Sequence, residues 1–216
     1  MPECHLDHLV ITAPTLDAGC AYVEQQLGVR PQPGGQHPRM GTHNSLLRLA
    51  DSIYLEVIAI DPDAREPSRP RWFGLDDLSL DASPRLATWV VRCDDIHEVV
   101  EKSPMSLGAI EPMSRGELEW LITIPADGEL IMDGAGPTVI QWTTGQHPAS
   151  RLADCGCRLS RLEIVHPDAV RLNTRLDAMG LVRNDLIDVF GQNGMRCLTA
   201  HVQTANGRRQ LSGTGT

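Results

Sequence analysis

The feature that most constrains the fold is a pattern of one strand followed by one helix, which occurs three times in the 216-residue sequence. The first copy has an alternating strand at 5–12 and a helix at about 15–27, with apolar residues at helical spacing. The second strand is expected at 86–93 and the third at 158–165, each with a helix after it. Three strand-like segments follow each pair: 30–38, 44–50 and 52–60, then 108–114, 117–124 and 137–143, then 182–190, 195–203 and 207–212.

The repeated units determine the expected domain organisation. A unit of strand, helix and three strands spans roughly 70 to 80 residues and cannot bury both faces of its sheet alone, so units have to pair to complete a core. The predicted fold class is therefore α+β, built from repeated βαβββ units. We predict one domain over 1–143, with units 1–60 and 85–143 and a linker at 61–84, and a third, structural unit over 157–216. The third unit covers an exposed sheet edge or contacts a second copy in a homodimer.

Charge and hydropathy exclude several classes of protein. The 19 basic and 28 acidic residues give a net charge of −9, so the chain lacks the basic footprint that a nucleic-acid-binding protein needs. The same charge argues against attraction to an anionic membrane surface, and no apolar run is long enough for a membrane span. The first residues alternate like a strand and lack the basic and apolar regions of a signal peptide, so the expected compartment is the cytoplasm.

Aromatic residues are scarce, at 4% of the sequence, and the tryptophans are unevenly distributed. Trp89, Trp120 and Trp142 all fall in the second unit. On one interpretation, Trp120 and Trp142 line a substrate pocket that stacks on a flat or apolar ligand. On the other, the rings fill a core that is otherwise built from small aliphatic residues. The pattern alone allows both interpretations.

The chain resembles the vicinal oxygen chelate superfamily, which includes glyoxalase I, extradiol dioxygenases and bleomycin-resistance proteins, and within it the glyoxalase-like domain proteins. The resemblance rests on the segments HLDHLVITAPTLDAG, GGQHPRMGTHNSLLRLADSIYLEVIAIDP, ELEWLITIP, TVIQW and GCRLSRLEIVHPDAVRL, which cover nearly the whole chain in order. It implies that the two units of 1–143 form a glyoxalase-like domain with a cupped mixed sheet. It also implies that the cup holds a divalent metal ion or a small-molecule ligand.

The resemblance further implies that metal ligands come from the first and last strands of each of two units. These positions carry His8 and Glu56 in the first unit and Thr88 and Gln141 in the second. A Glu56 carboxylate among apolar neighbours is costly to bury unless it pairs with a cation. His8 and Glu56 therefore either bind a divalent metal ion, with Zn, Ni, Mn and Fe as candidates, or belong to a metal-free pocket.

Three further polar residues are candidates for the same cup. His43 opens the strand that pairs with the strand of Glu56, and with His8 it would complete a metal site of two histidines and one carboxylate. Alternatively, His43 lines the pocket or bonds a loop without touching metal. Asn44 and Gln141 are predicted to line the substrate pocket.

Two functions follow from these predictions. In the first, the protein is a glyoxalase-like small-molecule enzyme of unassigned substrate, a divalent-metal-dependent lyase, isomerase or dioxygenase. Glu56 then binds the metal or, when displaced from it, acts as a general base. In the second, the protein is a non-catalytic binder that sequesters an apolar or aromatic small molecule, as resistance-type relatives do. Five further histidines are expected to contribute little as ligands: His37 in a Gly/Pro loop that could border the cup, His97 on a solvated helix face, and His147, His166 and His201 outside the cup.

Overall fold

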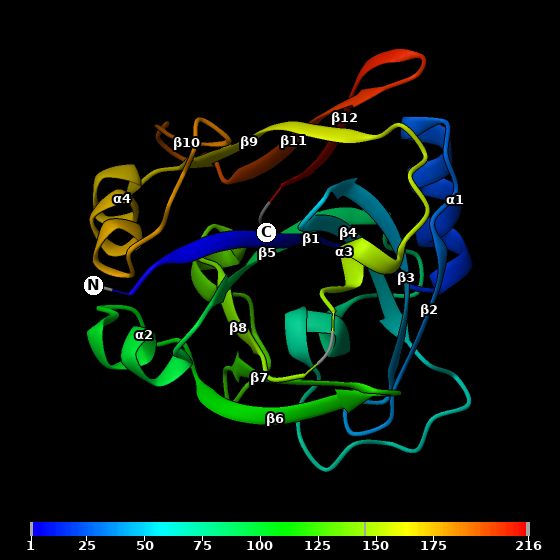
Figure 1. The fold of residues 1–216 in the computed structure, drawn as a ribbon, viewed down its shortest axis with the longest axis horizontal. Helices are drawn as coiled ribbons and strands as arrows, with labels where there is room; N and C mark the ends of the chain where they lie inside the picture. Colours follow the sequence, from blue (N-terminus) through cyan, green and yellow to red (C-terminus); the bar gives the residue numbers. More distant parts are fainter. Residues whose placement is uncertain (1, 145, 215–216) are drawn as a thin grey trace.

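The computed structural model describes residues 2–144 and 146–214, which fold into two β-sheets with helices packed against them (Figure 1). The first unit contains β1 (Cys4–Thr12), α1 (Leu16–Leu27), β2 (Gln32–His37), β3 (Thr42–Ala50) and β4 (Ile53–Ile60). The linker after it contains η1 (Trp72–Asp77), and the second unit contains β5 (Arg85–Cys93), α2 (Ile96–Lys102), β6 (Ala109–Arg115), β7 (Leu118–Ile124), η2 (Ile131–Gly134) and β8 (Thr138–Trp142). The rest of the chain forms α3 (Pro148–Arg151), β9 (Arg158–His166), α4 (Ala169–Ala178), β10 (Ile187–Gly191), β11 (Cys197–Thr204) and β12 (Gly207–Thr214).

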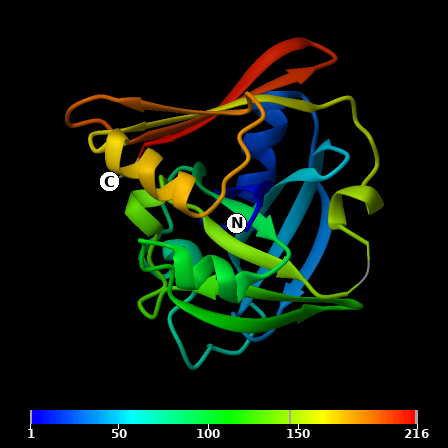
Figure 2. The same cartoon turned by 60° about the vertical axis from the view of Figure 1, so that its left-hand side comes forward.

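The first two units share one curled sheet of eight strands, in the order β2-β3-β4-β1-β5-β8-β7-β6. The units meet where β1 pairs antiparallel with β5, and in each unit the first strand pairs parallel with the last, β1 with β4 and β5 with β8. Figures 1 and 2 show the sheet curling around an interior. This mixed sheet confirms the predicted α+β class and the cup made by two βαβββ units.

The third unit has the expected order of elements but a different pairing. Its sheet has the order β10-β9-β11-β12, and β9 pairs parallel with β10, the strand that directly follows α4. In the first two units the strand after the helix, β2 or β6, lies instead at a sheet edge. A parallel neighbour requires a crossover, which α4 provides. The predicted domain boundaries stay predictions, and Met1 and residues 215–216 within them lie outside the described residues.

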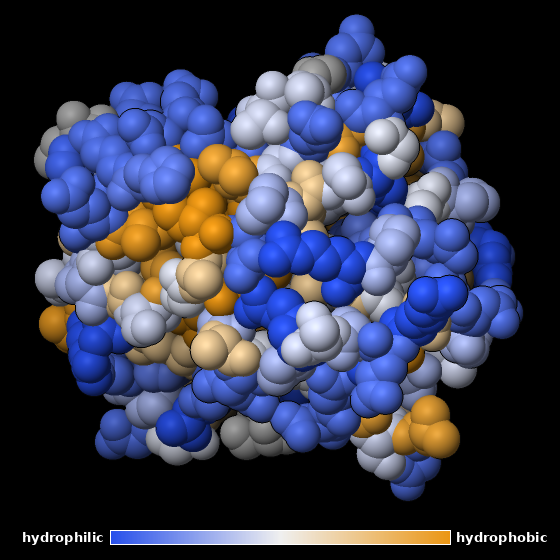
Figure 3. Space-filling model, turned by 90° about the horizontal axis from the view of Figure 1, so that it is seen from below, coloured by the Kyte–Doolittle hydropathy of each residue, from blue (hydrophilic) through white to orange (hydrophobic). Residues whose placement is uncertain are grey.

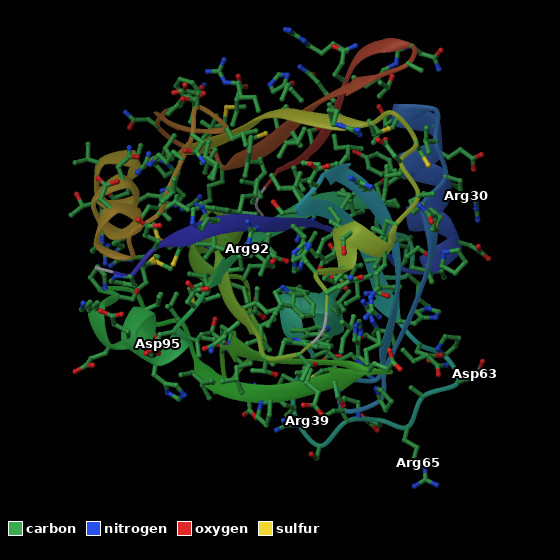
Figure 4. All side chains as sticks on the ribbon, viewed as in Figure 1. Arg30, Arg39, Asp63, Arg65, Arg92 and Asp95 are labelled. Carbon is green, nitrogen blue, oxygen red and sulfur yellow. The ribbon has the colours of Figure 1, made fainter. Side chains whose placement is uncertain are left out.

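Local signals in the sequence place the helices. Thr15 caps α1 by accepting a hydrogen bond from the Ala18 N–H at 3.2 Å, and Gly28 ends this helix with a left-handed φ of 76°. Asp95 caps α2 in the same way, through the N–H groups of its first turn (Figure 4). None of the helices in the described residues is long and apolar enough to cross a membrane. Most of the face seen in Figure 3 is hydrophilic, in keeping with the net charge of −9.

The two faces of the large sheet have different partners. One face packs on α1, α2 and the second sheet in a single aliphatic core, which also holds Trp89. The third unit is therefore a cover for this outer face. The opposite face lines the inside of the cup, with Val10 and Trp120 among its buried residues.

Salt bridges close the cup where the edge strands β2 and β6 approach each other. Glu111 on β6 forms ion pairs with Arg39 and Arg69, the latter at 2.7 Å (Figure 4 labels Arg39). The linker adds Trp72 and Phe73 of η1 to the buried wall. Because these contacts join both edges of the sheet, the interior of the cup is shielded from solvent.

Candidate active site

A β-bulge in β1 builds the centre of the site. The register with β5 shifts between Leu6, which lies opposite Val91, and His8, which lies opposite Val90, so Asp7 is an extra residue without a partner. Such a bulge re-aims a side chain that strict alternation would place on the other face. As a result, Asp7 and His8 lie together, and the Nδ1 of His8 donates to the Oδ1 of Asp7 at 2.6 Å.

The other ring nitrogen of His8 faces Glu56. The distance from His8 Nε2 to Glu56 Oε2 is 3.5 Å, and the two residues are only 3% and 6% exposed. Glu56 reaches this position because β4 runs parallel to β1 and places it opposite Val10. The ring of Tyr54 stacks on the imidazole with centroids 4.5 Å apart. The imidazole of His8 is therefore held between two carboxylates and against one ring.

Asp7 has two further partners, one from the second unit and one from the linker after it. Its Oδ2 accepts from the Nε1 of Trp142 and from the Nε2 of His147, both at 2.9 Å. The Nδ1 of His147 accepts from the Ala149 N–H at 3.3 Å, so the proton that binds Asp7 is on Nε2. A fully buried carboxylate needs such donors. Among the described residues Asp7 has three, namely His8, Trp142 and His147.

Asn44 orients Glu56 from the opposite side. Its Oδ1 accepts from the Gly35 N–H at 2.9 Å, which turns Nδ2 toward Glu56, and Nδ2 donates to Oε1 at 2.5 Å. Glycine at position 34 makes room for this amide, because a Cβ there would lie 2.1 Å from the Asn44 Oδ1. The backbone of β2 therefore fixes the Glu56 carboxylate through the side-chain amide of Asn44.

The charges in the site support one another. Burial opposes the charge on His8, but the hydrogen bonds and charges of Asp7 and Glu56 outweigh it and raise its pKa to about 9. Burial likewise opposes ionisation of the two carboxyls, but His8 and the other donors lower the pKa of Glu56 to about 2 and that of Asp7 further. Burial lowers the pKa of His37 to about 4. At neutral pH the site holds an imidazolium between two carboxylates, beside a neutral His37.

The cavity in front of these groups is small, about 20 Å³. That is enough for roughly one water molecule. The first unit contributes most of its polar side chains and the second an apolar wall with one arginine. The lining residues are His8, His37, Tyr54, Glu56, Trp72, Phe73, Arg115, Trp120, Ile122, Ile140 and Trp142.

The structure brings together most of the residues predicted from the sequence, with two corrections. His8, Glu56, Asn44, Trp120 and Trp142 contact one another or line this cavity. The other two predicted residues, His43 and Gln141, lie outside this cavity.

His43 lies one residue from Asn44 on β3 and therefore points to the other face of the sheet, where it lines a separate groove with Leu16 and Cys20. Gln141 also faces away from the cup, and its Oε1 accepts from the Ile96 N–H at the start of α2. Both corrections follow from the period of two in a strand.

Strand register also shows that Gln141, the predicted match of Glu56 in the second unit, is not its counterpart. Val10 lies opposite Glu56 in the first unit, and the equivalent Val90 lies opposite Thr138 in the second. The counterpart of Glu56 is therefore Thr138, three residues before the predicted Gln141. Thr88, the counterpart of His8, contacts the carbonyl oxygen of Gly134. Among the described residues, the second unit thus offers only hydroxyl groups at both positions.

Four carboxylate, imidazole or guanidinium side chains of the site were not among the predicted site residues: Asp7, His37, Arg115 and His147. Strict alternation puts Asp7 and His8 on opposite faces of the strand, and a bulge that brings them together leaves no clear mark in a sequence. His147 lies in the linker after β8 and reaches Asp7 only through tertiary folding. Within HLDHLV, the one available signal was an aspartate beside a histidine in an otherwise apolar strand.

The donors fit a divalent metal ion only in part. The Nδ1 of His8 is bonded to a carboxylate, as in many metal-ligating histidines, and a separation of 3.5 Å between Nε2 and the Glu56 oxygen suits two ligands of one ion. Within the chain as described, however, no three His, Cys, Asp or Glu side chains are arranged to hold a metal. The protein supplies two donors, and His43 is not the third. These residues do not form a complete metal centre.

The fold and the site define a member of the vicinal oxygen chelate superfamily, because two βαβββ units form one cup with His8 and Glu56 on the first and last strands of a unit. The sequence profile of the family described as "Glyoxalase-like domain" matches residues 6–180. The chain therefore belongs to this glyoxalase-like domain family.

Solved structures of low sequence identity are similar to this chain, and the first of them, with a TM-score above 0.5, shows the same fold. A hypothetical protein from Staphylococcus aureus is 12% identical, with a TM-score of 0.60 over 96% of this chain and 84% of that one. Methylmalonyl-CoA epimerase from Mycobacterium tuberculosis is 14% identical, with a TM-score of 0.41 over 65% of this chain and 88% of that one. A mutant 4-hydroxymandelate synthase from Streptomyces coelicolor is 12% identical, with a TM-score of 0.46 over 99% of this chain and 64% of that one. No curated protein matches the chain significantly.

Proposed function

We propose that this protein is a small-molecule enzyme of the glyoxalase-like type that moves a proton on a carbon next to a carbonyl group. In this proposal Glu56 is the base and His8 is the acid. The observation that carries the proposal is the buried His8 imidazolium facing the Glu56 carboxylate across 3.5 Å inside the cup. Two adjacent titratable groups whose environments push their pKa values far apart are typical of an acid and base pair.

The proposed step begins when the reacting carbons of a substrate lie between the two groups. The proton on the carbon passes to a Glu56 oxygen, and the electron pair of the C–H bond forms a carbon–carbon double bond. The carbonyl oxygen takes the proton from the Nε2 of His8, which gives an enol. Because the substrate separates the ion pair, the pKa of Glu56 rises from about 2 toward its ordinary value as the substrate enters, and Glu56 becomes a better base.

The neighbouring residues hold this pair in position. Asp7 keeps His8 protonated and directs its Nε2 toward the cavity, while Asn44 holds one Glu56 oxygen and leaves the other for chemistry. The cavity has room for about one water molecule, so lining side chains must move before a substrate can enter.

The divalent metal ion expected from the sequence stays a prediction. A metal would have to displace the proton on the Nε2 of His8, and its remaining ligands would be water or substrate. Metal analysis of the purified protein at rising pH tests this, because loss of that proton would strengthen metal binding.

Hydrogen–deuterium exchange tests the proposal without knowledge of the final product. Small 2-oxo and 2-hydroxy carbonyl compounds are incubated with the protein in D₂O, and proton NMR follows the loss of signals next to the carbonyl. We expect exchange with at least one compound, and its loss in Glu56→Gln, a variant of the same shape without a base. Thermal unfolding shows whether each variant is folded.

The sequestering function predicted from the sequence has a distinct outcome in the same assay. A binder would shift in thermal unfolding with aromatic compounds, equally in the wild type and in Glu56→Gln, and would catalyse no exchange. That result would contradict the proposed proton transfer.

A further inference from the structure

A groove lies beside the small cavity of the site, and Arg115 lines both. The groove has a volume of about 700 Å³ and is formed by β2, the turn between β6 and β7, and α3. Arg115, the last residue of β6, lines this groove and also the inner cavity that contains His8 and Glu56. A molecule in the groove would therefore meet the Arg115 side chain before it reaches the acid and base.

Arg115 differs from the other arginines at this end of the cup. Arg39 and Arg69 are both bound to Glu111, whereas Arg115 makes no hydrogen bond or ion pair to any residue that the structure describes. The side chain is only partly exposed, and its charge helps to lower the pKa of His37 inside the cup. A guanidinium with no partner among the described residues thus lies at the boundary between the groove and the inner cavity.

Glycine at position 35 makes room for this arrangement. A Cβ on Gly35 would lie 2.8 Å from the Cδ of Arg115 and 3.1 Å from its Cγ. The arginine stem therefore lies directly against the β2 backbone. A larger residue at position 35 would have to push the stem aside.

The charges around Arg115 indicate which kind of ligand its guanidinium would bind. The inner cluster has two carboxyl groups, Asp7 and Glu56, on either side of the one imidazole of His8, and the whole chain carries a net charge of −9. An anionic group would be repelled by this cluster unless a cation met it first. A guanidinium offers several N–H donors in one plane, which match the two oxygens of a carboxylate.

We propose that Arg115 binds a carboxylate of the substrate at the boundary between groove and cavity and so directs a neighbouring carbonyl group to His8 and Glu56. The substrate class is then a small 2-oxo carboxylate, with any larger substituent in the groove. This inference rests on the proposed function, because it names the substrate class for the same acid and base.

Matched pairs of ligands test the inference by binding alone. Pyruvate, 2-oxobutyrate and phenylpyruvate are each compared with their methyl esters, which lack the charge. Binding is followed by tryptophan fluorescence, since Trp120 and Trp142 line the cavity. We expect at least one carboxylate to bind more tightly than its ester and to weaken with added salt. Binding of none of the carboxylates at millimolar concentration, or equal binding of acid and ester, would overturn the inference.

Four variants assign the effect to its residue. Arg115→Gln should weaken carboxylate binding about tenfold or more, because a charge-assisted hydrogen bond is lost, and Arg115→Lys should restore part of it. Gly35→Ala should weaken binding while it keeps the charge, because it displaces the arginine stem. Arg151→Gln removes an exposed arginine that lines the groove but not the cavity, and binding should change little. An equal effect of Arg151→Gln and Arg115→Gln would overturn the assignment to Arg115.

The exchange assay separates this inference from the proposed function. If both hold, Glu56→Gln still binds the carboxylate but no longer catalyses exchange. Carboxylate binding through Arg115 without exchange in the wild type would support the anion site and contradict the proton transfer. Exchange that is as fast with esters as with acids, and unchanged in Arg115→Gln, would support the proton transfer and overturn the anion site.

Discussion

Replacement of Asp7 by asparagine tests whether a buried carboxylate keeps His8 protonated. In the wild type, the Nδ1 of His8 donates to the Oδ1 of Asp7 at 2.6 Å, and Trp142 and His147 donate to the other oxygen. Asparagine keeps the shape and one acceptor oxygen, which Trp142 and His147 can still use. Its amide N–H group, however, would face the N–H of His8. His8 therefore loses an anion and gains an opposing donor.

The size of the effect follows from the pKa of His8. A rise from 6.5 to about 9 corresponds to about 3 kcal/mol of stabilisation of the folded state. Because the pKa is higher in the folded state, this stabilisation is fully present below pH 6.5 and is lost as the pH rises through about 9. In Asp7→Asn the burial remains but the contribution of Asp7 is gone. We expect the pKa of His8 to fall and the free energy of unfolding at pH 6 to decrease by about 3 kcal/mol.

Two measurements check this prediction. Urea unfolding between pH 6 and 9 should show a decline in stability for the wild type and a much flatter profile for Asp7→Asn. NMR titration of the histidine ring should show the lower pKa directly. Asp63→Asn, an exposed control (Figure 4), should keep the wild-type profile. The reasoning is refuted if Asp7→Asn keeps the wild-type decline, or if its His8 still titrates near pH 9.

Two further substitutions test single contacts. Trp142→Phe keeps a ring in the wall but removes the N–H that bonds Asp7 at 2.9 Å, so the free energy of unfolding should fall by about 1–3 kcal/mol in urea unfolding, and an unchanged value would show that this bond contributes nothing. Gln141→Leu removes the acceptor for the Ile96 N–H, so stability should fall by about 1 kcal/mol while ligand binding and exchange stay at wild-type levels. A loss of binding in Gln141→Leu would instead favour a role for this side chain in the pocket.

The sequence was sufficient for the fold class and for the order of the strands and helices. Hydrophobic periodicity located the strands and helices within a few residues, and three repeats of one pattern implied paired units. It also indicated that His8 and Glu56 need partners, because a charged or imidazole side chain in the middle of an apolar strand requires one. These are local properties of the chain. They can be read from the sequence because buried and exposed side chains alternate along a strand. The roles of His8 and Glu56 stay predictions.

Only the tertiary structure decided which side chains share the cup. A shift of one residue in a strand moves a side chain to the opposite face, so His43 and Gln141 lie outside while Asn44 and Trp142 lie inside. The bulge at Asp7 depends on how β1 pairs with β5, and no local pattern specifies it.

Segments far apart in the sequence also meet only in the folded chain. His147 approaches Asp7 from the linker after β8, and Arg115 reaches the cavity from the end of β6. The third unit repeats the order of elements but pairs β9 with β10, because pairing depends on which strands can bury each other's faces. Sequence periodicity therefore determined the layers of this protein, whereas strand register and long-range packing determined its site.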